Sequence, residues 1–216
     1  MTSRPTAMPA ILVHGLGRTS ASMLVLAVRL RRRGFQPRLF SYSAAIESFA
    51  ACTERLRHFI DRNAGDTQYV LVGHSLGTVL LRSVVPCLRT QPAACFLIAP
   101  PAQASRVARA LAPQWLFRIL TGEMGQLLAN QEFISRLPVP TCATRTYAGT
   151  AGFKRGWLPR GWLPFGDEPN DGILAVSETV IPGIPTTPVR KLHTFIMNAV
   201  IIADDIENVV SAVVET

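Results

Sequence analysis

A serine flanked by glycines is the first residue in this sequence whose setting suggests catalysis. Residues 73–77 read Gly-His-Ser-Leu-Gly, and Ser75 has the spacing of a strand-to-helix turn that exposes a nucleophilic hydroxyl. The pattern alone is weak, because two glycines around a serine also arise by chance. Its context strengthens it, since a strand-like run at residues 69–72 precedes it and a helix-like run follows from Leu76. The sequence therefore predicts Ser75 as a nucleophile at a helix N-terminus, where backbone amides favour negative charge.

A serine hydroxyl needs a base to remove its proton, and histidine is the usual one. The chain has four histidines, of which His58 falls in an amphipathic helical pattern and His14 in a glycine motif. His74 adjoins the serine, but the geometry of such a turn points it elsewhere. His193 follows a strand-like run, so it falls on a loop at the carboxyl edge of the sheet, where ligands and catalysts collect. We therefore expect His193 to be the general base.

The carboxylate that orients this histidine should lie between the serine and the histidine in the chain. Asp171 stands in an Asn-Asp-Gly turn directly before an apolar run, which suits such a group, although Asp-Gly is also an ordinary turn dipeptide. The spacing favours Asp171 but leaves five other acidic residues of the interval open: Asp167, Glu168, Glu178, Glu123 and Glu132.

Acyl transfer at a serine also needs two backbone N–H groups that hold the developing oxyanion. Leu76, directly after the serine, is expected to supply one. Residues 14–17, His-Gly-Leu-Gly, follow the first predicted strand, and their glycines let the backbone turn an amide inward. We therefore predict Leu16 as the second donor. The alternative is an ordinary glycine turn, which the position between a strand and a helix disfavours.

Strand-like and helix-like segments alternate along the chain, which indicates a mostly parallel sheet flanked by helices in a single α/β domain spanning residues 1–216. Short apolar runs predict strands at residues 10–13, 35–40, 69–72, 95–99, 141–148 and 189–192. Helical periodicity predicts helices over residues 44–63, over 76–88, from Asp204 or Asp205 onward, and along the stripe Met23, Leu26, Ala27 and Leu30. Pro37 gives the second strand an irregular or edge position.

The segment 103–140 is the candidate cap or lid over the site. Its pattern is helical but is broken by Pro113, Gly122 and Gly125. Aromatic residues in this segment and after it are available to bind an apolar substrate, with packing in the core or in loops as the alternative. The candidates for substrate binding are Trp115, Phe117, Trp157 and Trp162.

Composition excludes several classes of protein. Hydrophobic residues make up 48% and charged residues 17%, which argues against disorder, and no apolar run reaches the roughly 18 residues that a membrane span needs. The start of the chain lacks the apolar core of a secretory signal, so the expected location is cytoplasmic. The four cysteines fit no metal-binding pattern. The net charge of +8 can attract anions, but scattered arginines without interleaved aromatic residues argue against nucleic acid and leave peripheral association with an anionic membrane open.

Taken together, these residues resemble the small bacterial lipase/esterase branch of the α/β-hydrolase superfamily. The likeness covers most of the chain and rests on residues 11–19, 73–77, 99–101, 125–128, 170–172 and 192–197. The resemblance implies a parallel-sheet core and a Ser-His-Asp triad acting on acyl esters, raises Asp171 above its rivals, and implies no metal and no cofactor. One departure is Ala-Gln-Ala-Ser at residues 102–105, where such proteins often have Asn-Gln-Gly-Ser. This departure leaves the local geometry of the cap open.

The expected activity is hydrolysis of a small-molecule ester or lipid by a serine esterase or lipase, through an acyl-enzyme on Ser75. Two alternatives use the same scaffold: transfer of the acyl group to an alcohol or amine, and binding without catalysis. The sequence does not set the acyl-chain length, the acceptor or the oligomeric state.

Overall fold

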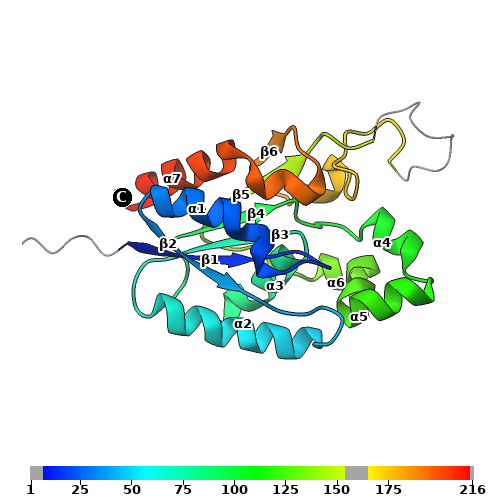
Figure 1. The fold of residues 1–216 in the computed structure, drawn as a ribbon, viewed down its shortest axis with the longest axis horizontal. Helices are drawn as coiled ribbons and strands as arrows, with labels where there is room; N and C mark the ends of the chain where they lie inside the picture. The colour runs from blue at the N-terminus through cyan, green and yellow to red at the C-terminus, as the bar shows by residue number, and fades with distance from the viewer. Residues whose placement is uncertain (1–6, 154–164, 215–216) are drawn as a thin grey trace, which may run out of the picture.

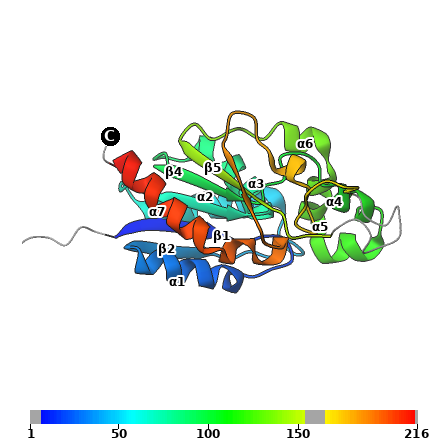
Figure 2. The ribbon, with the colours of Figure 1, turned by 90° about the horizontal axis from the view of Figure 1, so that it is seen from above.

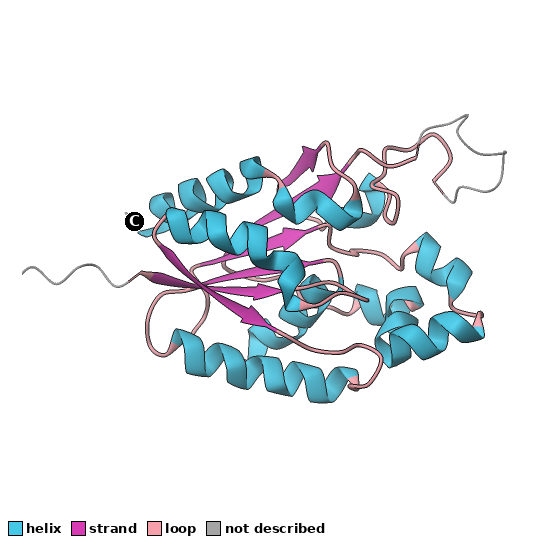
Figure 3. Ribbon diagram, in the orientation of Figure 1, coloured by secondary structure: helices cyan, strands magenta, loops and turns pink. Residues whose placement is uncertain are grey.

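A parallel sheet forms the centre of the computed structural model, which describes residues 7–153 and 165–214 of the 216-residue chain. Its six strands follow the order β2-β1-β3-β4-β5-β6. They are β1 (Met8–Val13), β2 (Phe35–Phe40), β3 (Val70–His74), β4 (Ala94–Ile98), β5 (Ala143–Gly149) and β6 (Thr186–Val189). All the arrowheads point to the same end of the sheet (Figure 3). The predicted α/β class with a parallel central sheet is confirmed.

Helices cover both faces of this sheet. The α-helices are α1 (Leu24–Arg32), α2 (Phe49–Ala64), α3 (Leu76–Val84), α4 (Arg106–Leu111), α5 (Trp115–Ala129), α6 (Gln131–Ser135) and α7 (Val200–Val214), and the short 3-10 turns are η1 (Ser20–Met23), η2 (Val85–Cys87), η3 (Val176–Thr179) and η4 (His193–Asn198). Helices α1 and α7 lie on one face, and α2 and α3 on the other (Figure 1). Helices α4, α5 and α6 gather beyond the carboxyl ends of the strands, as the view from above also shows (Figure 2).

The alternation of side chains along the strands builds two separate cores. In β1, Ala10 and Leu12 pack in the cluster that includes residues of α1 and α7, whereas Ile11 and Val13 pack in the cluster with residues of α2 and α3. Such a strand is buried on both faces, which is why its sequence reads as one apolar run. Strand β2, which contains Pro37, is an end strand as predicted.

Helix α2 starts later than the apolar pattern of its sequence predicts. Helix α2 begins at Phe49 because the Ser48 side chain caps it, accepting a hydrogen bond from the Ala51 amide at 3.2 Å. Ile46, which the pattern placed on the buried stripe, lies before this cap and is 87% exposed. The predicted start at residue 44 was therefore wrong.

The end of the chain departs from the prediction in the same way. Helix α7 begins at Val200 rather than Asp204, because Ala199 is the extended residue that separates it from η4. Asp204 lies inside the helix and forms a salt bridge with Arg33. The strand predicted at residues 189–192 ends at residue 189, so the chain reaches His193 through a loop.

The segment 103–140 folds as the helices α4, α5 and α6, with two breaks. Pro113 falls between α4 and α5, and Gly122 interrupts α5 with a φ of +55°. A Cβ at Gly122 would lie 2.5 Å from the carbonyl oxygen of Ala44, so both the conformation and the close approach require glycine there. Gly125 does not break the chain but is buried within α5.

Candidate active site

Ser75 lies in the tight turn between β3 and α3, at the carboxyl end of a central strand. Its φ of +52° and ψ of −119° form a conformation that residues with a side chain rarely adopt. The turn is held because the Ser75 amide donates to the carbonyl of Ile98 at 2.9 Å. Backbone strain of this kind clusters at functional sites.

Glycines let the segments around the serine approach one another closely. A Cβ at Gly77 would lie 2.4 Å from the carbonyl oxygen of Val13, and one at Gly15 would lie 2.9 Å from Nδ1 of His74. The first of these contacts involves backbone, which cannot rotate away. The spacing of glycines in the sequence therefore reflects the packing of the first loop against the start of α3.

The two predicted oxyanion donors come from the loops that meet at the serine. Leu76 opens α3, and Leu16 follows β1 and lines the cavity described below. Within the described part of the chain, neither amide donates a hydrogen bond to another protein group, so both are free to bind an oxyanion. The loop that carries Leu16 is fixed through His14, whose ring stacks on Tyr42 at 4.2 Å between centroids and whose carbonyl accepts from the Tyr42 hydroxyl at 2.9 Å.

A buried carboxylate orients His193. Nδ1 of the ring lies 2.7 Å from Oδ2 of Asp171, whose side chain has no exposed surface. The other oxygen of Asp171 accepts from the amides of Ile173 and Leu174 at 2.9 and 2.7 Å, and the His193 amide donates to the Asp171 carbonyl at 2.9 Å. With a carboxylate at Nδ1, that nitrogen carries the proton and Nε2 is left as a hydrogen-bond acceptor. The structure thus joins two of the predicted site residues directly.

Ser75 and His193 line one cavity of about 310 Å³. Within the described residues no hydrogen bond joins the serine hydroxyl to the histidine ring, and such bonds are often long in unliganded sites and tighten when substrate binds. Most of the wall is apolar, as expected of a small-molecule site. The wall comprises Leu16, Gly17, Arg18, His74, Ser75, Pro101, Ser105, Val107, Ala108, Leu111, Phe117, Leu128, Ile173, Leu174, His193 and Thr194.

His74 supports the site in a way that the sequence did not reveal. Its Nε2 donates to the backbone carbonyl of His193 at 3.0 Å, and the two rings lie 4.9 Å apart. Burial first, and then the neighbouring His193, lowers the pKa of His74 well below its usual range, so the ring is neutral. Its position directly before the serine was the available signal.

The four aromatic residues predicted to bind substrate have different positions. Phe117 lines the cavity. Trp115 does not line it and is 71% exposed on α5. Trp157 and Trp162 lie outside the described residues.

Glu178, one of the predicted alternatives to Asp171, stabilises the fold instead of contacting His193. Glu178 is buried and accepts hydrogen bonds from the amides of Arg106 and Ala175 at 2.7 and 2.8 Å, so it ties the start of α4 to the loop after Asp171. The others do not line the cavity: Asp167, Glu168, Glu123 and Glu132.

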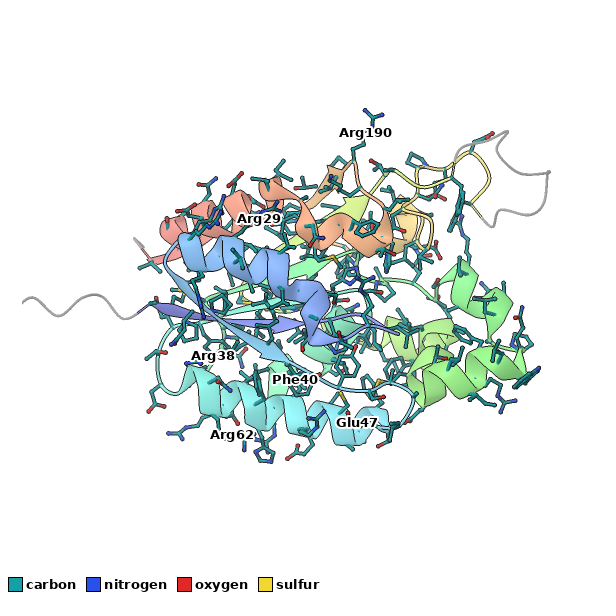
Figure 4. The ribbon with its side chains drawn as sticks, viewed as in Figure 1. Arg29, Arg38, Phe40, Glu47, Arg62 and Arg190 are labelled. Atoms are coloured by element: carbon teal, nitrogen blue, oxygen red, sulfur yellow. The ribbon has the colours of Figure 1, made fainter. Side chains whose placement is uncertain are left out.

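The rest of the described surface bears on other kinds of function. The labelled arginines are spread, with Arg62 on the α2 side and Arg190 on the β6 side (Figure 4). In the two described ranges, no helix combines the length and the apolar character that crossing a bilayer requires. Among the same residues, no three His, Cys, Asp or Glu side chains gather as a metal site would need.

Comparison with known proteins identifies solved structures with a similar fold and a matching family. A similar fold is found in the mature lipase BlEst2 of Bacillus licheniformis, at 16% identity and a TM-score of 0.72 over 96% of this chain and 93% of that one. A metagenomic carboxyl esterase matches at 16% identity and a TM-score of 0.71, over 97% and 77% of the two chains. The RedJ thioesterase of Streptomyces coelicolor matches at 12% identity and a TM-score of 0.60, over 95% and 86%. A comparison with curated protein sequences found no significant match. The sequence profile of the alpha/beta hydrolase family matches residues 10–210, and the chain therefore belongs to that family.

Proposed function

We propose that this chain hydrolyses carboxylic esters through an acyl-enzyme on Ser75. The observation that carries the proposal is the shared cavity, in which a serine in a strained turn meets a histidine whose other nitrogen is bound to the buried Asp171. Membership of the hydrolase family and the likeness in fold to esterases and lipases support the same reaction class.

Acylation follows from the arrangement of these groups. Nε2 of His193 accepts the hydroxyl proton while Oγ of Ser75 attacks the ester carbonyl carbon. The amides of Leu16 and Leu76 bind the oxyanion that forms, and the loss of one such donor would cost about 3–4 kcal/mol of transition-state stabilisation. The carboxylate of Asp171 stabilises the imidazolium.

The same imidazole completes acylation as an acid and then serves as the base in deacylation. The imidazolium of His193 gives its proton to the alkoxide oxygen as the C–O bond to the alcohol breaks. A water molecule then loses a proton to Nε2 and attacks the acyl carbonyl, and the proton returns to Oγ of Ser75 as the acid departs. The attack of Ser75 and the later attack of water each need Nε2 as an acceptor, and the contact of Nδ1 with Asp171 supports that tautomer.

We also propose that α4 and α5 act as a cap that holds the apolar acyl part. Five apolar side chains from these two helices line the cavity wall: Val107, Ala108, Leu111, Phe117 and Leu128. An acyl chain lying against them removes apolar surface from water, which favours binding by about 25 cal/mol per Å².

Replacement of the nucleophile tests the proposal. Ser75→Ala should abolish turnover of p-nitrophenyl butyrate and covalent labelling by a fluorophosphonate probe, because both reactions need Oγ. The matched control is Ser83→Ala on the same helix, since that hydroxyl donates only to the Val79 carbonyl at 2.9 Å. Turnover or labelling that survives Ser75→Ala would remove Ser75 from its role.

The same assays separate the two alternatives. If the acyl group is transferred to an alcohol, adding an acceptor alcohol will shift the product from acid to new ester at constant consumption of substrate. If the chain only binds ligands, the fluorophosphonate will not label Ser75 at all. We expect stoichiometric labelling and acid as the main product.

A further inference from the structure

Arg18 stands beside the reacting groups but has no role in the mechanism above. It follows Gly17, whose φ is +64°, in the loop that carries Leu16, and it lines the same cavity as Ser75 and His193. Arg18 therefore lies in the wall of the cavity in which the ester would bind, two residues from the proposed oxyanion donor Leu16.

The guanidinium of Arg18 is unpaired. Within the described part of the chain it has neither a hydrogen bond nor a salt bridge to another residue, and its Nε is buried without a partner. Arg82 shows the contrast, because that buried side chain donates to the carbonyls of Leu137 and Pro138 at 2.6 and 2.9 Å. A buried donor left unsatisfied is costly, so each such group calls for an explanation.

Within the cavity wall, no acidic side chain offsets the charge of Arg18. No Asp or Glu lines the cavity, and the carboxylate of Asp171 is engaged by His193 and two backbone amides. The chain as a whole carries a net charge of +8, which raises the local concentration of anionic molecules. The alternative is a solvated surface arginine, whereas Arg18 is half-buried and lines the cavity.

We propose that Arg18 binds an anionic group of the substrate, so that the preferred esters carry a carboxylate or a phosphate near the scissile carbonyl. Both groups offer the oxygen acceptors that a guanidinium binds with two parallel hydrogen bonds. This inference rests on the proposed ester hydrolysis at Ser75 and adds the substrate class.

Matched pairs of esters test this inference and locate the anion. The acyl-side pair is p-nitrophenyl hydrogen adipate and its methyl ester. The alcohol-side pairs are p-butyryloxybenzoate and its methyl ester, and p-butyryloxyphenyl phosphate and its dimethyl ester. Each ester is assayed with the wild type, Arg18→Gln, Arg18→Lys and Arg62→Gln, the last being a matched loss of charge on the exposed side of α2. Ratios of variant to wild type cancel the intrinsic reactivity of each ester.

We expect Arg18→Gln to lower kcat/KM for at least one anionic ester by about 10- to 100-fold, the range for hydrogen bonds to charged groups. The neutral partner should change less than twofold, and Arg18→Lys should retain part of the preference. Arg62→Gln should leave every ratio unchanged. The carboxylate and phosphate pairs show which oxyacid is preferred.

Two outcomes would overturn the inference: a wild type that does not prefer any anionic ester, or a preference that survives Arg18→Gln. In either case hydrolysis of neutral esters that depends on Ser75 would leave the proposed function standing. If no ester is hydrolysed, the proposed function fails, and calorimetry of phenylphosphonate binding still tests Arg18. Equal affinity for wild type and Arg18→Gln would then refute it.

Discussion

Replacement of Asp171 by asparagine should move the ring proton of His193 from Nδ1 to Nε2 without disturbing the loop that carries residue 171. Oδ1 of Asp171 accepts from the amides of Ile173 and Leu174, and Oδ2 faces Nδ1 of His193 at 2.7 Å. The two backbone amides need an acceptor, so the asparagine oxygen must take the place of Oδ1. Its NH₂ group then faces the ring and can only donate, which makes Nδ1 an acceptor and moves the proton to Nε2.

The size of the effect follows from the loss of the base. An imidazole protonated at Nε2 cannot accept the hydroxyl proton of Ser75, and this wrong tautomer lowers kcat by about 10⁴-fold. At about 1.4 kcal/mol for each factor of ten, the barrier rises by about 5–6 kcal/mol. The fold should tolerate the change, because the new side chain keeps the shape and the acceptor of the old one.

The assay is kcat/KM for p-nitrophenyl butyrate, with thermal unfolding measured on the same samples. Asp167→Asn is the matched control, because it removes the same charge from an exposed position four residues away. If the Asp171→Asn variant unfolds at the wild-type temperature yet keeps more than a tenth of the activity, then Asp171 does not set the tautomer of His193. The assignment of the base would then have to be reconsidered.

Two further predictions concern stability. Gly77→Ala should lower the free energy of unfolding by about 3 kcal/mol, since the added Cβ would lie 2.4 Å from the carbonyl oxygen of Val13 and 2.6 Å from that of His14. A melting temperature within 2 °C of the wild type, where about 6–12 °C of loss is expected, would refute this reasoning. His74 should destabilise the fold in acid, because burial lowers its pKa in the folded chain. Below about pH 6.5 the unfolded chain therefore binds a proton at His74 that the folded chain does not bind. The matched variant is His74→Asn, which keeps a donor for the His193 carbonyl. Below that pH, the free energy of unfolding measured in urea should fall by about 1.4 kcal/mol per pH unit less in this variant than in the wild type. Parallel pH profiles of the two proteins would contradict the argument.

The fold was largely predictable because buried parallel strands leave a strong trace in sequence. A strand covered on both faces, such as β1, needs apolar side chains at every position, and no surface helix does. The starts of helices were less predictable, because they depend on single hydrogen bonds. The bond from the Ala51 amide to Ser48 excludes Ile46 from α2, although the apolar period alone continues through it.

The proposed catalytic residues leave a clearer signal in the sequence than the wall of the cavity does. The order of Ser75, Asp171 and His193 along the chain is a property of sequence, whereas the direction of a side chain on α5 depends on how that helix packs. Trp115 and Phe117 are two residues apart, so they project from different sides of a helix. Only the packing of α5 decides which of them meets the cavity, and the structure selects Phe117.

The choice between Asp171 and Glu178 shows what linear order leaves open. Both carboxylates lie between the serine and the histidine, and both are buried. The oxygens of Glu178 accept from two backbone amides, one at the start of α4 and one at Ala175, whereas Asp171 binds backbone with one oxygen and keeps the other for His193. Glu178 therefore connects α4 to the stretch 171–178 that begins at Asp171. The position of α4 and the orientation of the histidine are set by one continuous segment, residues 171–178.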